Sequence, residues 1–233
     1  MKIATGKPSE SGEFIHKRRL RLLRSLSSIL NNNDGLLLDV GCGNGAMTEL
    51  LLPYFSLIIG TDVVENKIIN KNIIFQQIVS ADDKMPFKDS IFDAITSFEV
   101  FEHCERPDLM MIECFRILKP GGQMVLSVPN KWWIFETHGA NLPLLLWNRV
   151  PFFSWLPKNL HDRWAKAYIF SKKELVSLIQ KAGFTDFSVD YLTAPMDRVK
   201  NAWLKELLKK TFFHHDSTPN PFISVSLIAV ITK

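Results

Sequence analysis

The chain has 233 residues, of which 46% are apolar and 22% are charged, and its formal net charge is +4. These values are typical of a folded globular protein and exclude an intrinsically disordered chain. The small excess of positive charge falls short of a nucleic-acid-binding surface.

The three cysteines, Cys42, Cys104 and Cys114, are spaced neither like a disulfide framework nor like the ligands of a zinc site. We therefore expect a reducing, cytoplasmic setting and no metal. Residues 1–10 lack the apolar core of a signal peptide, and no stretch of about 18 residues is free of charged and polar side chains. The sequence thus predicts a soluble or at most peripheral protein, with a single domain over residues 1–233.

In chain order, the pattern begins with an N-terminal helix over residues 12–31. From about residue 36 to residue 130, short apolar runs alternate with helical patterns, which predicts βαβ units and a parallel sheet. Continuous apolar runs suit strands that are covered on both faces. The strands are expected at 36–40, 57–62, 73–79, 92–98 and 123–128, and the helices between them at 46–52, 64–70 and 108–118.

Beyond residue 170 the local signals agree with one another. Ser171 and Glu174 form a capping-box pattern for a helix over 172–182, and Gly183 follows as its C-terminal stop. Two further β segments are expected at 186–192 and 223–232, separated by an amphipathic stretch at 199–210. As a hairpin-like pair, these two segments would complete a seven-stranded sheet.

A glycine-rich turn follows the first predicted strand, and its sequence is Asp39-Val40-Gly41-Cys42-Gly43-Asn44-Gly45. Gly41 and Gly43 would allow positive φ and a close approach of the backbone to a ligand, and Gly45 would let the next helix pack on the strand. A flat ligand that bears a nucleoside suits such a turn. Glycine turns also end ordinary strands, so the turn alone leaves a purely structural role open.

Two aspartates strengthen the ligand-binding interpretation. Asp62 ends the second predicted strand about 20 residues beyond the turn, where a carboxylate can accept both ribose hydroxyls of an adenosine. The alternative is a solvated aspartate at a strand end. Asp39 ends an apolar strand, where an unpaired charge is costly, so it should meet backbone amides or a ligand ammonium, or else hold the turn together.

The turn resembles motif I of the class I methyltransferases, and the likeness continues along the chain. Residues 85–93, Met-Pro-Phe-Lys-Asp-Ser-Ile-Phe-Asp, are similar to the family's Leu-Pro-Phe…Phe-Asp segment. Glu102-His103 and residues 116–122, Arg-Ile-Leu-Lys-Pro-Gly-Gly, match the segments that follow. The likeness is dense over 35–130 and looser over 171–184, and it is strongest to small-molecule enzymes such as the quinone-biosynthesis methyltransferases.

This resemblance implies a Rossmann-like, doubly wound α/β fold, with a mostly parallel seven-stranded sheet and an antiparallel C-terminal strand. It implies S-adenosyl-L-methionine as cofactor and S-adenosyl-L-homocysteine as product. The glycine turn would contact the methionine part, the acid of strand two the ribose, and residues 81–83 the adenine, although Ala81 stands where many relatives carry Asp or Asn. The expected cofactor contacts are Asp39, Gly41, Cys42, Gly43, Asn44, Gly45, Asp62, Val63, Ala81, Asp82, Asp83, Phe98, Glu99 and His103.

Residues 97–103 lack the Asn/Asp-Pro-Pro-Tyr motif and the Pro-Cys nucleophile of nucleic-acid methyltransferases, which argues against DNA as the acceptor. Methyl transfer from a sulfonium is a displacement on carbon, so a base is needed only where the acceptor has a proton to lose. His103 is the first candidate for that base, with a structural role at the start of a helix as the alternative. His138 and Tyr168 are further candidates.

Residues 131–170 lie between strand five and the following helix, where we expect a helical and aromatic lid. They contain five of the six tryptophans, which favours an aromatic cover over a large apolar pocket. An ordinary, self-packed insertion is the alternative. The basic segments 16–24 and 205–210, together with this apolar insertion, would permit transient contact with an anionic membrane.

The leading hypothesis is therefore methyl transfer to oxygen or carbon of a small, bulky, partly apolar acceptor. A protein or RNA acceptor is the second hypothesis, and a cofactor-binding module without catalysis is the third. A dehydrogenase fits less well, because the turn lacks the sixth-position glycine of the dinucleotide-binding pattern.

Overall fold

The computed structural model describes residues 13–31, 34–64, 68, 70–78, 84–140, 150–196 and 199–233. Within these residues, eight strands form one sheet in the order β3-β2-β1-β4-β5-β8-β6-β7. Strands β1 to β5 pair in parallel, and β8 runs antiparallel to its neighbours β5 and β6. The strands are β1 (Leu36–Val40), β2 (Leu57–Asp62), β3 (Ile73–Gln77), β4 (Phe92–Phe98), β5 (Leu118–Pro129), β6 (Asp186–Thr193), β7 (Ser217–Thr218) and β8 (Ser224–Thr232).

This topology confirms the predicted fold class, a mostly parallel, doubly wound sheet with an antiparallel C-terminal strand. The two-residue β7 adds an eighth strand at the edge. Strand β5 begins earlier than the predicted residue 123, because the end of the chain pairs with it. Gly121 donates its N–H to the carbonyl of Lys233 at 2.7 Å, and Lys233 donates to the carbonyl of Gly122 at 3.1 Å.

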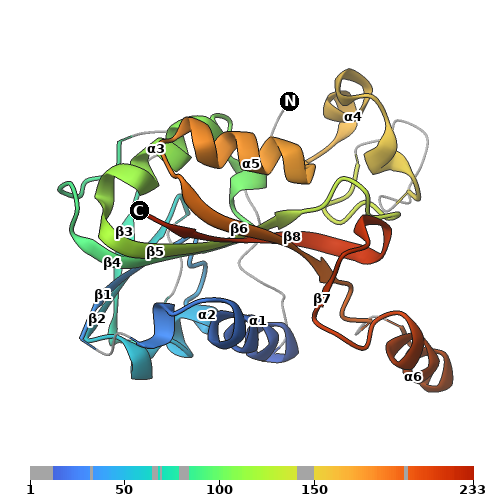
Figure 1. The fold of residues 1–233 in the computed structure, drawn as a ribbon, viewed down its shortest axis with the longest axis horizontal. Coiled ribbons are helices and arrows are strands. Elements are labelled where there is room, and N and C mark those ends of the chain that lie inside the picture. Colours follow the sequence, from blue (N-terminus) through green and yellow to red (C-terminus); the bar gives the residue numbers. More distant parts are fainter. Residues whose placement is uncertain are drawn as a thin grey trace.

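Helices cover both faces of the sheet (Figure 1). Helices α1 (Glu13–Leu26) and α2 (Ala46–Glu49) lie on one face, and α3 (Pro107–Ile117) and α5 (Lys172–Lys181) lie on the other. Helix α2 is shorter than predicted and is followed by a 3-10 turn, η2 (Leu52–Tyr54), in which Pro53 has no N–H to continue the helix. The predicted helix 64–70 lies largely outside the described residues.

Two apolar layers hold the helices on the sheet. Under α3 and α5, Phe92 and Ile95 of β4 pack with a cluster that includes Leu175 and Ile179 of α5, which are one helical turn apart. Under α1 and α2, Leu37 packs in a second cluster with residues of both helices. The capping box that starts α5 is confirmed, since Ser171 and Glu174 each bond the other's backbone N–H.

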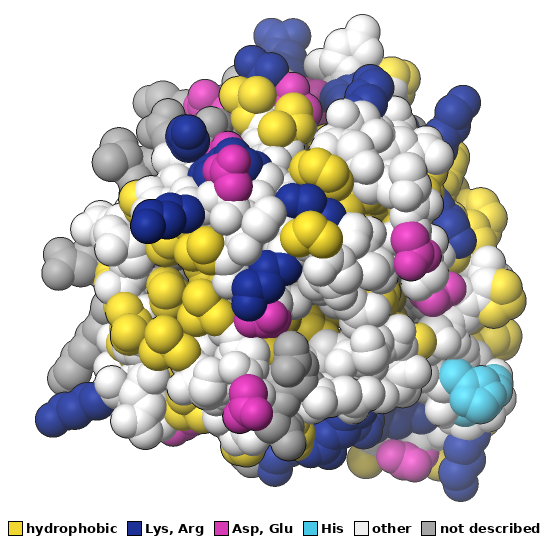
Figure 2. All heavy atoms as spheres, turned by 60° about the vertical axis from the view of Figure 1, so that its left-hand side comes forward, with side chains coloured by type: hydrophobic (Ala, Val, Ile, Leu, Met, Phe, Trp, Pro, Cys, Tyr) yellow, Lys and Arg dark blue, Asp and Glu magenta, His cyan; other side chains and the backbone are white. Residues whose placement is uncertain are grey.

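The basic side chains of α1 are engaged within the molecule. Arg18 is buried and donates to Asp216 at 2.8 Å and to the carbonyl of Thr193 at 2.7 Å. Arg21 also pairs with Asp216, and Arg24 donates to the hydroxyl of Tyr54. These contacts tie α1 to the C-terminal part of the sheet and to η2. Figure 2 shows that on the face it views, basic side chains are separated by acidic and apolar ones.

Residues 131–170, called the insertion below, leave and rejoin the sheet at one place. Lys131 donates to the carbonyl of Phe170 at 2.9 Å, and Phe170 donates to the carbonyl of Pro129 at 3.1 Å. The described part contains η4 (Phe153–Trp155) and α4 (Lys158–Trp164), and it has a small apolar cluster of its own. Residues 141–149, with Trp147, lie outside the described residues. No helix within the described ranges is long and apolar enough to cross a membrane.

Candidate active site

The glycine turn joins β1 to α2 and is bonded to the end of β2. Gly41 and Cys42 both donate to the carbonyl of Thr61, at 2.7 and 3.0 Å. Gly41 and Gly43 have φ angles of 71° and 57°, which confirms the positive values expected for them. Gly45 also has a positive φ, of 82°, although the sequence led us to expect it only to let the next helix pack on the strand. A Cβ atom on Gly41 would lie 2.3 Å from Cγ2 of Val100. The chain that follows β4 is therefore pressed directly against the turn.

Asp62 holds the turn from the end of β2. One carboxylate oxygen accepts the N–H of Gly43 at 2.9 Å, and the other accepts the N–H of Val64 at 3.0 Å. A carboxylate has about four acceptor sites, so Asp62 retains capacity for the hydroxyls of a ligand. Because Asp62 bonds the backbone of the glycine turn, it is not simply a solvated aspartate at the end of a strand.

Asp39 has different partners from those that the sequence led us to expect. Its buried carboxylate accepts hydrogen bonds from the hydroxyls of Thr48 and Thr96, in place of backbone amides. Burial raises the pKa of Asp39, and the two hydroxyls oppose that shift. Thr48 lies in α2 and Thr96 in β4, so Asp39 links the helix after the turn to the neighbouring strand.

The remaining turn residues mostly support its shape. The side chain of Asn44 accepts the N–H of Ala46 at 3.1 Å at the start of α2. Cys42 packs on Gly60 of β2, where an added Cβ would lie 2.7 Å from its sulfur, and burial raises the pKa of its thiol. Val63 follows Asp62, and its carbonyl accepts from Gln77 at 3.3 Å. The expected adenine contacts Ala81, Asp82 and Asp83 lie outside the described residues.

Arg19 of α1 reaches this site, although sequence reasoning placed it only in a basic helix. Its guanidinium lies 5.0 Å from the centre of the Phe98 ring, at the end of β4. Burial lowers the pKa of Arg19, and the carboxylates of Glu99, Asp39 and Glu102 oppose that shift. An arginine stays protonated in such a setting. It therefore provides a fixed positive charge beside the glycine turn.

The backbone at the end of β4 has an unusual conformation. Glu99 has a φ of 58°, a left-handed value that is rare outside glycine. It is held there by its N–H, which donates to the carbonyl of Ser127 at 3.0 Å, and by its side chain, which accepts from the Ser127 hydroxyl at 2.9 Å. After this bend at Glu99, the chain continues into residues 101–103, which contact the insertion through the hydrogen bond from Tyr168 to Glu102.

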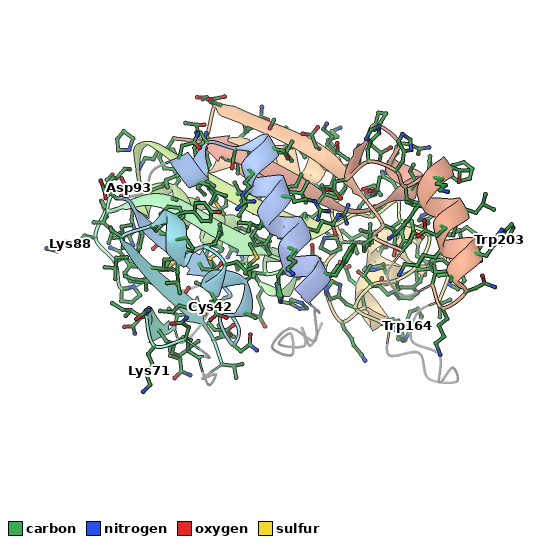
Figure 3. All side chains as sticks on the ribbon, turned by 90° about the horizontal axis from the view of Figure 1, so that it is seen from below. Cys42, Lys71, Lys88, Asp93, Trp164 and Trp203 are labelled. Atoms are coloured by element: carbon green, nitrogen blue, oxygen red, sulfur yellow. The ribbon has the colours of Figure 1, made fainter. Side chains whose placement is uncertain are left out.

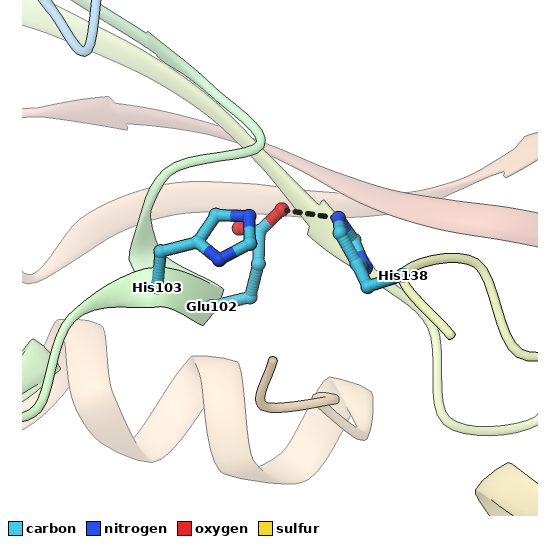
Figure 4. Close-up of side chains that lie close together, drawn as sticks. All are labelled: Glu102, His103 and His138. Carbon is cyan, nitrogen blue, oxygen red and sulfur yellow. Dashed lines mark ion pairs between the residues drawn. The ribbon is translucent and has the colours of Figure 1, made fainter. Parts of the chain in front are cut away.

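Three titratable side chains meet at that point (Figure 4). Glu102 and His103 lie in η3 (Phe101–His103), and His138 lies in the insertion. The fully buried carboxylate of Glu102 is 3.4 Å from Nε2 of His138, and the rings of His103 and His138 meet edge to face at 5.0 Å. Tyr168 donates its backbone N–H to the carbonyl of Glu102 at 2.8 Å. The structure thus brings the side chains of two predicted base candidates, His103 and His138, together with Glu102, whereas the third candidate, Tyr168, contacts Glu102 through its backbone N–H.

Known proteins resemble this chain in sequence and in fold. A family model described as a methyltransferase domain matches residues 38–126, which include the glycine turn, Asp62, Glu102 and His103. The chain is a class I S-adenosylmethionine-dependent methyltransferase. Its cofactor is S-adenosyl-L-methionine, as the resemblance implied.

The relatives of this methyltransferase include quinone-pathway enzymes. A ubiquinone biosynthesis O-methyltransferase of Cereibacter sphaeroides is 28% identical over 203 residues, or 75% of this chain and 78% of the relative. A S-adenosylmethionine-dependent methyltransferase of Thermotoga maritima shares the fold, with a TM-score of 0.62, 18% identity and coverage of 94% and 89% of the two chains. Phosphoethanolamine N-methyltransferase 2 of Haemonchus contortus, solved with S-adenosylmethionine, gives a TM-score of 0.57 at 15% identity and covers 93% and 52%.

Burial and mutual contact shift the pKa values of Glu102 and His138 in the cluster that these two residues form with His103 in the methyltransferase. Desolvation, with the charge of Glu99 adding to it, raises the pKa of Glu102 to about 7, while His138 opposes the shift. Desolvation alone would lower the pKa of His138, but the hydrogen bond and charge of Glu102 outweigh it and raise that pKa to about 9. His138 is therefore mostly a cation at neutral pH, paired with an adjacent carboxylate.

The same cluster is a candidate set of metal ligands. One ligand atom from each of Glu102, His103 and His138 lies within 4.8 Å of the other two. One carboxylate and two imidazoles suit a divalent transition metal. The expectation of no metal, drawn from cysteine spacing, stays a prediction.

The ion pair makes the stability of the methyltransferase depend on pH. The pKa of His138 is about 9 in the fold against 6.5 as its ordinary value, so its stabilising contribution is complete below about pH 6.5 and is lost as pH rises through 9. We expect the unfolding free energy to fall by about 2 kcal/mol between pH 6 and pH 9, or about 4–8 °C in Tm. Thermal melts at both pH values test this, with the double variant Glu102→Gln/His138→Gln as the comparison, because a buried Glu102 without His138 would itself titrate in this range. An equal pH dependence in the two proteins would contradict it.

Proposed function

We propose that the methyltransferase methylates an oxygen or carbon of a small, bulky, partly apolar acceptor, such as a quinone or lipid precursor. The observation that carries this proposal is the cluster in which the buried Glu102 meets the partly buried His103 and His138, where the chain after β4 meets the aromatic insertion. A desolvated cluster of this kind can manage the proton of a hydroxylated acceptor. The relatives named as ubiquinone biosynthesis O-methyltransferases support the same class of acceptor.

The residues around the turn fit S-adenosyl-L-methionine. Gly41 and Gly43 have positive φ and no side chains, so a ligand can approach the backbone of the turn. Asp62 has acceptor capacity left for the ribose hydroxyls. Arg19 offers a positive charge to the methionine carboxylate. Phe98 and Glu99 at the end of β4 line the same edge of the sheet. When bound, the cofactor supplies a methyl group on a sulfonium, and the protein residues position the acceptor against it.

Within the cluster we assign different roles to the two imidazoles. His138 is already protonated near neutral pH, so it stabilises the Glu102 carboxylate and any negative charge that develops on the acceptor oxygen. His103, whose ring packs against that of His138, is then the group that accepts the acceptor's proton. Tyr168 contacts the cluster through its backbone N–H, and we give it a structural role in holding the insertion over Glu102.

A protein or RNA acceptor is less well supported. That hypothesis relied on a basic N-terminal helix as a guiding surface, but Arg18, Arg21 and Arg24 bind Asp216, Thr193 and Tyr54. Reversing their charges would disrupt internal contacts, and so would not test recognition. The acceptor is better sought among small molecules.

The test is to incubate the enzyme with S-adenosyl-L-methionine and a set of phenols and catechols, with and without an isoprenoid chain. We expect S-adenosyl-L-homocysteine to form with the members that carry an apolar chain. His103→Gln should lower kcat about 100-fold with little change in KM. His214→Gln, at an exposed histidine outside the cluster, is the matched control. Product formation with protein or RNA alone, or an unchanged kcat in His103→Gln, would contradict the proposal.

A further inference from the structure

Helix α6 (Ala202–Thr211) stands apart from the two helical layers. It lies between β6 and β7 in the chain and projects at the edge of the molecule (Figure 1). None of its residues is buried. Its side chain hydrogen bonds are local, with the Asn201 side chain capping the N–H of Leu204 at 3.0 Å. The helix is therefore formed, but it is not used to build the core.

An apolar stripe of α6 faces solvent. Trp203, Leu204, Leu207 and Leu208 have the spacing of one helix face. Trp203 is 73% exposed and Leu207 is 43% exposed. Figure 3 shows Trp203 at the outer end of the molecule. Phe212, directly after the helix, and Phe14 of α1 are exposed as well, and the ammonium of Lys209 lies 5.7 Å from the Phe14 ring.

Lysines surround the apolar stripe of α6: by helical spacing Lys205 and Lys209 lie on the opposite face, and Lys210 lies beside the stripe. The helix contains Lys205, Lys209 and Lys210 but a single acidic residue, Glu206. Asp216, which follows the helix in the chain, is paired with Arg18 and Arg21 of α1. An exposed tryptophan and leucines on one face, with lysines on the other, is the pattern of a helix that lies in the interface of an anionic membrane.

We infer that α6 docks the methyltransferase on an anionic lipid bilayer, with Trp203 and Leu207 inserted among the acyl chains and the lysines at the headgroups. A second protein would be expected to need acidic side chains opposite the lysines and a pocket for Trp203, whereas a bilayer satisfies both requirements without a specific shape. The inference concerns a surface outside the proposed catalytic cluster, so it does not depend on the proposed acceptor.

Cosedimentation with vesicles tests the inference, using the full chain without substrate. We expect binding to phosphatidylcholine vesicles that contain phosphatidylglycerol to be at least about tenfold tighter than to pure phosphatidylcholine, and to weaken in high salt. Leu207→Glu should reduce binding about tenfold or more. Ile112→Glu makes the same change at a 45% exposed position of α3 and should leave binding unchanged.

Three results would overturn the inference: equal binding to both kinds of vesicle, equal losses in the two variants, or no binding. Sedimentation equilibrium without lipid tests whether α6 binds a second copy of the chain instead. Self-association that is lost in Leu207→Glu would show that it does, and would overturn the inference. S-adenosyl-L-homocysteine formation with a water-soluble acceptor should be the same in Leu207→Glu and the natural protein. Failure of docking is thereby distinguishable from failure of the proposed function.

Discussion

Asp62→Ala is expected to weaken binding of S-adenosyl-L-methionine by about 100-fold or more. A charge-assisted hydrogen bond contributes about 1.5–3 kcal/mol, and we assign to Asp62 bonds with the ribose hydroxyls. The change also removes the acceptors for the N–H groups of Gly43 and Val64, which loosens the turn that meets the cofactor. Isothermal titration with S-adenosyl-L-methionine and S-adenosyl-L-homocysteine measures the effect without an acceptor.

Two further variants separate the ligand contact from the shape of the turn. Asp62→Asn keeps one oxygen to accept a turn amide but loses the charge, so its affinity should lie between those of the natural protein and Asp62→Ala. Asp190→Ala removes an exposed carboxylate on β6 and should bind normally. An unchanged Kd in Asp62→Ala, with a normal melting curve, would show that the ribose lies elsewhere.

Gly41→Ala should destabilise the fold by about 3 kcal/mol or more. The φ of 71° costs an alanine about 1–2 kcal/mol. The new methyl group would also lie 2.3 Å from Cγ2 of Val100, and relieving such an overlap costs about 1–3 kcal/mol. Urea unfolding measures the loss, and cofactor affinity should fall with it because the turn must move.

Gly121→Ala is the matched control that measures the cost of a positive φ without a steric overlap. Gly121 has a similar φ of 76°, but nothing lies within 4 Å of an added Cβ, so this change should cost only about 1–2 kcal/mol. In a double-mutant cycle, Val100→Ala should recover part of the loss in Gly41→Ala and none of the loss in Gly121→Ala. Equal losses in the two glycine variants would mean that Val100 does not press on the turn.

The local sequence was sufficient for features that depend on neighbouring residues. The apolar runs predicted β1, β2 and β4 at their observed boundaries, because strands covered on both faces need continuous apolar side chains. The Ser171 and Glu174 capping box and the positive φ of Gly41 and Gly43 could be predicted for a similar reason, because each depends on residues that are close in the sequence. The ordered motifs also identified the class of enzyme and its cofactor.

Only the tertiary structure decided which distant residues meet. Thr48 and Thr96 satisfy Asp39, and Arg19 reaches the end of β4 from a helix that looked merely basic. The Glu102 to His138 ion pair joins residues 36 positions apart. Burial raises the pKa of Glu102, and the contact with Glu102 raises the pKa of His138 against its own burial, which no local pattern encodes. Sequence thus determined the strands, the turn and the chemistry of the cofactor, whereas packing across the sheet determined which charges are desolvated and therefore what the site can do.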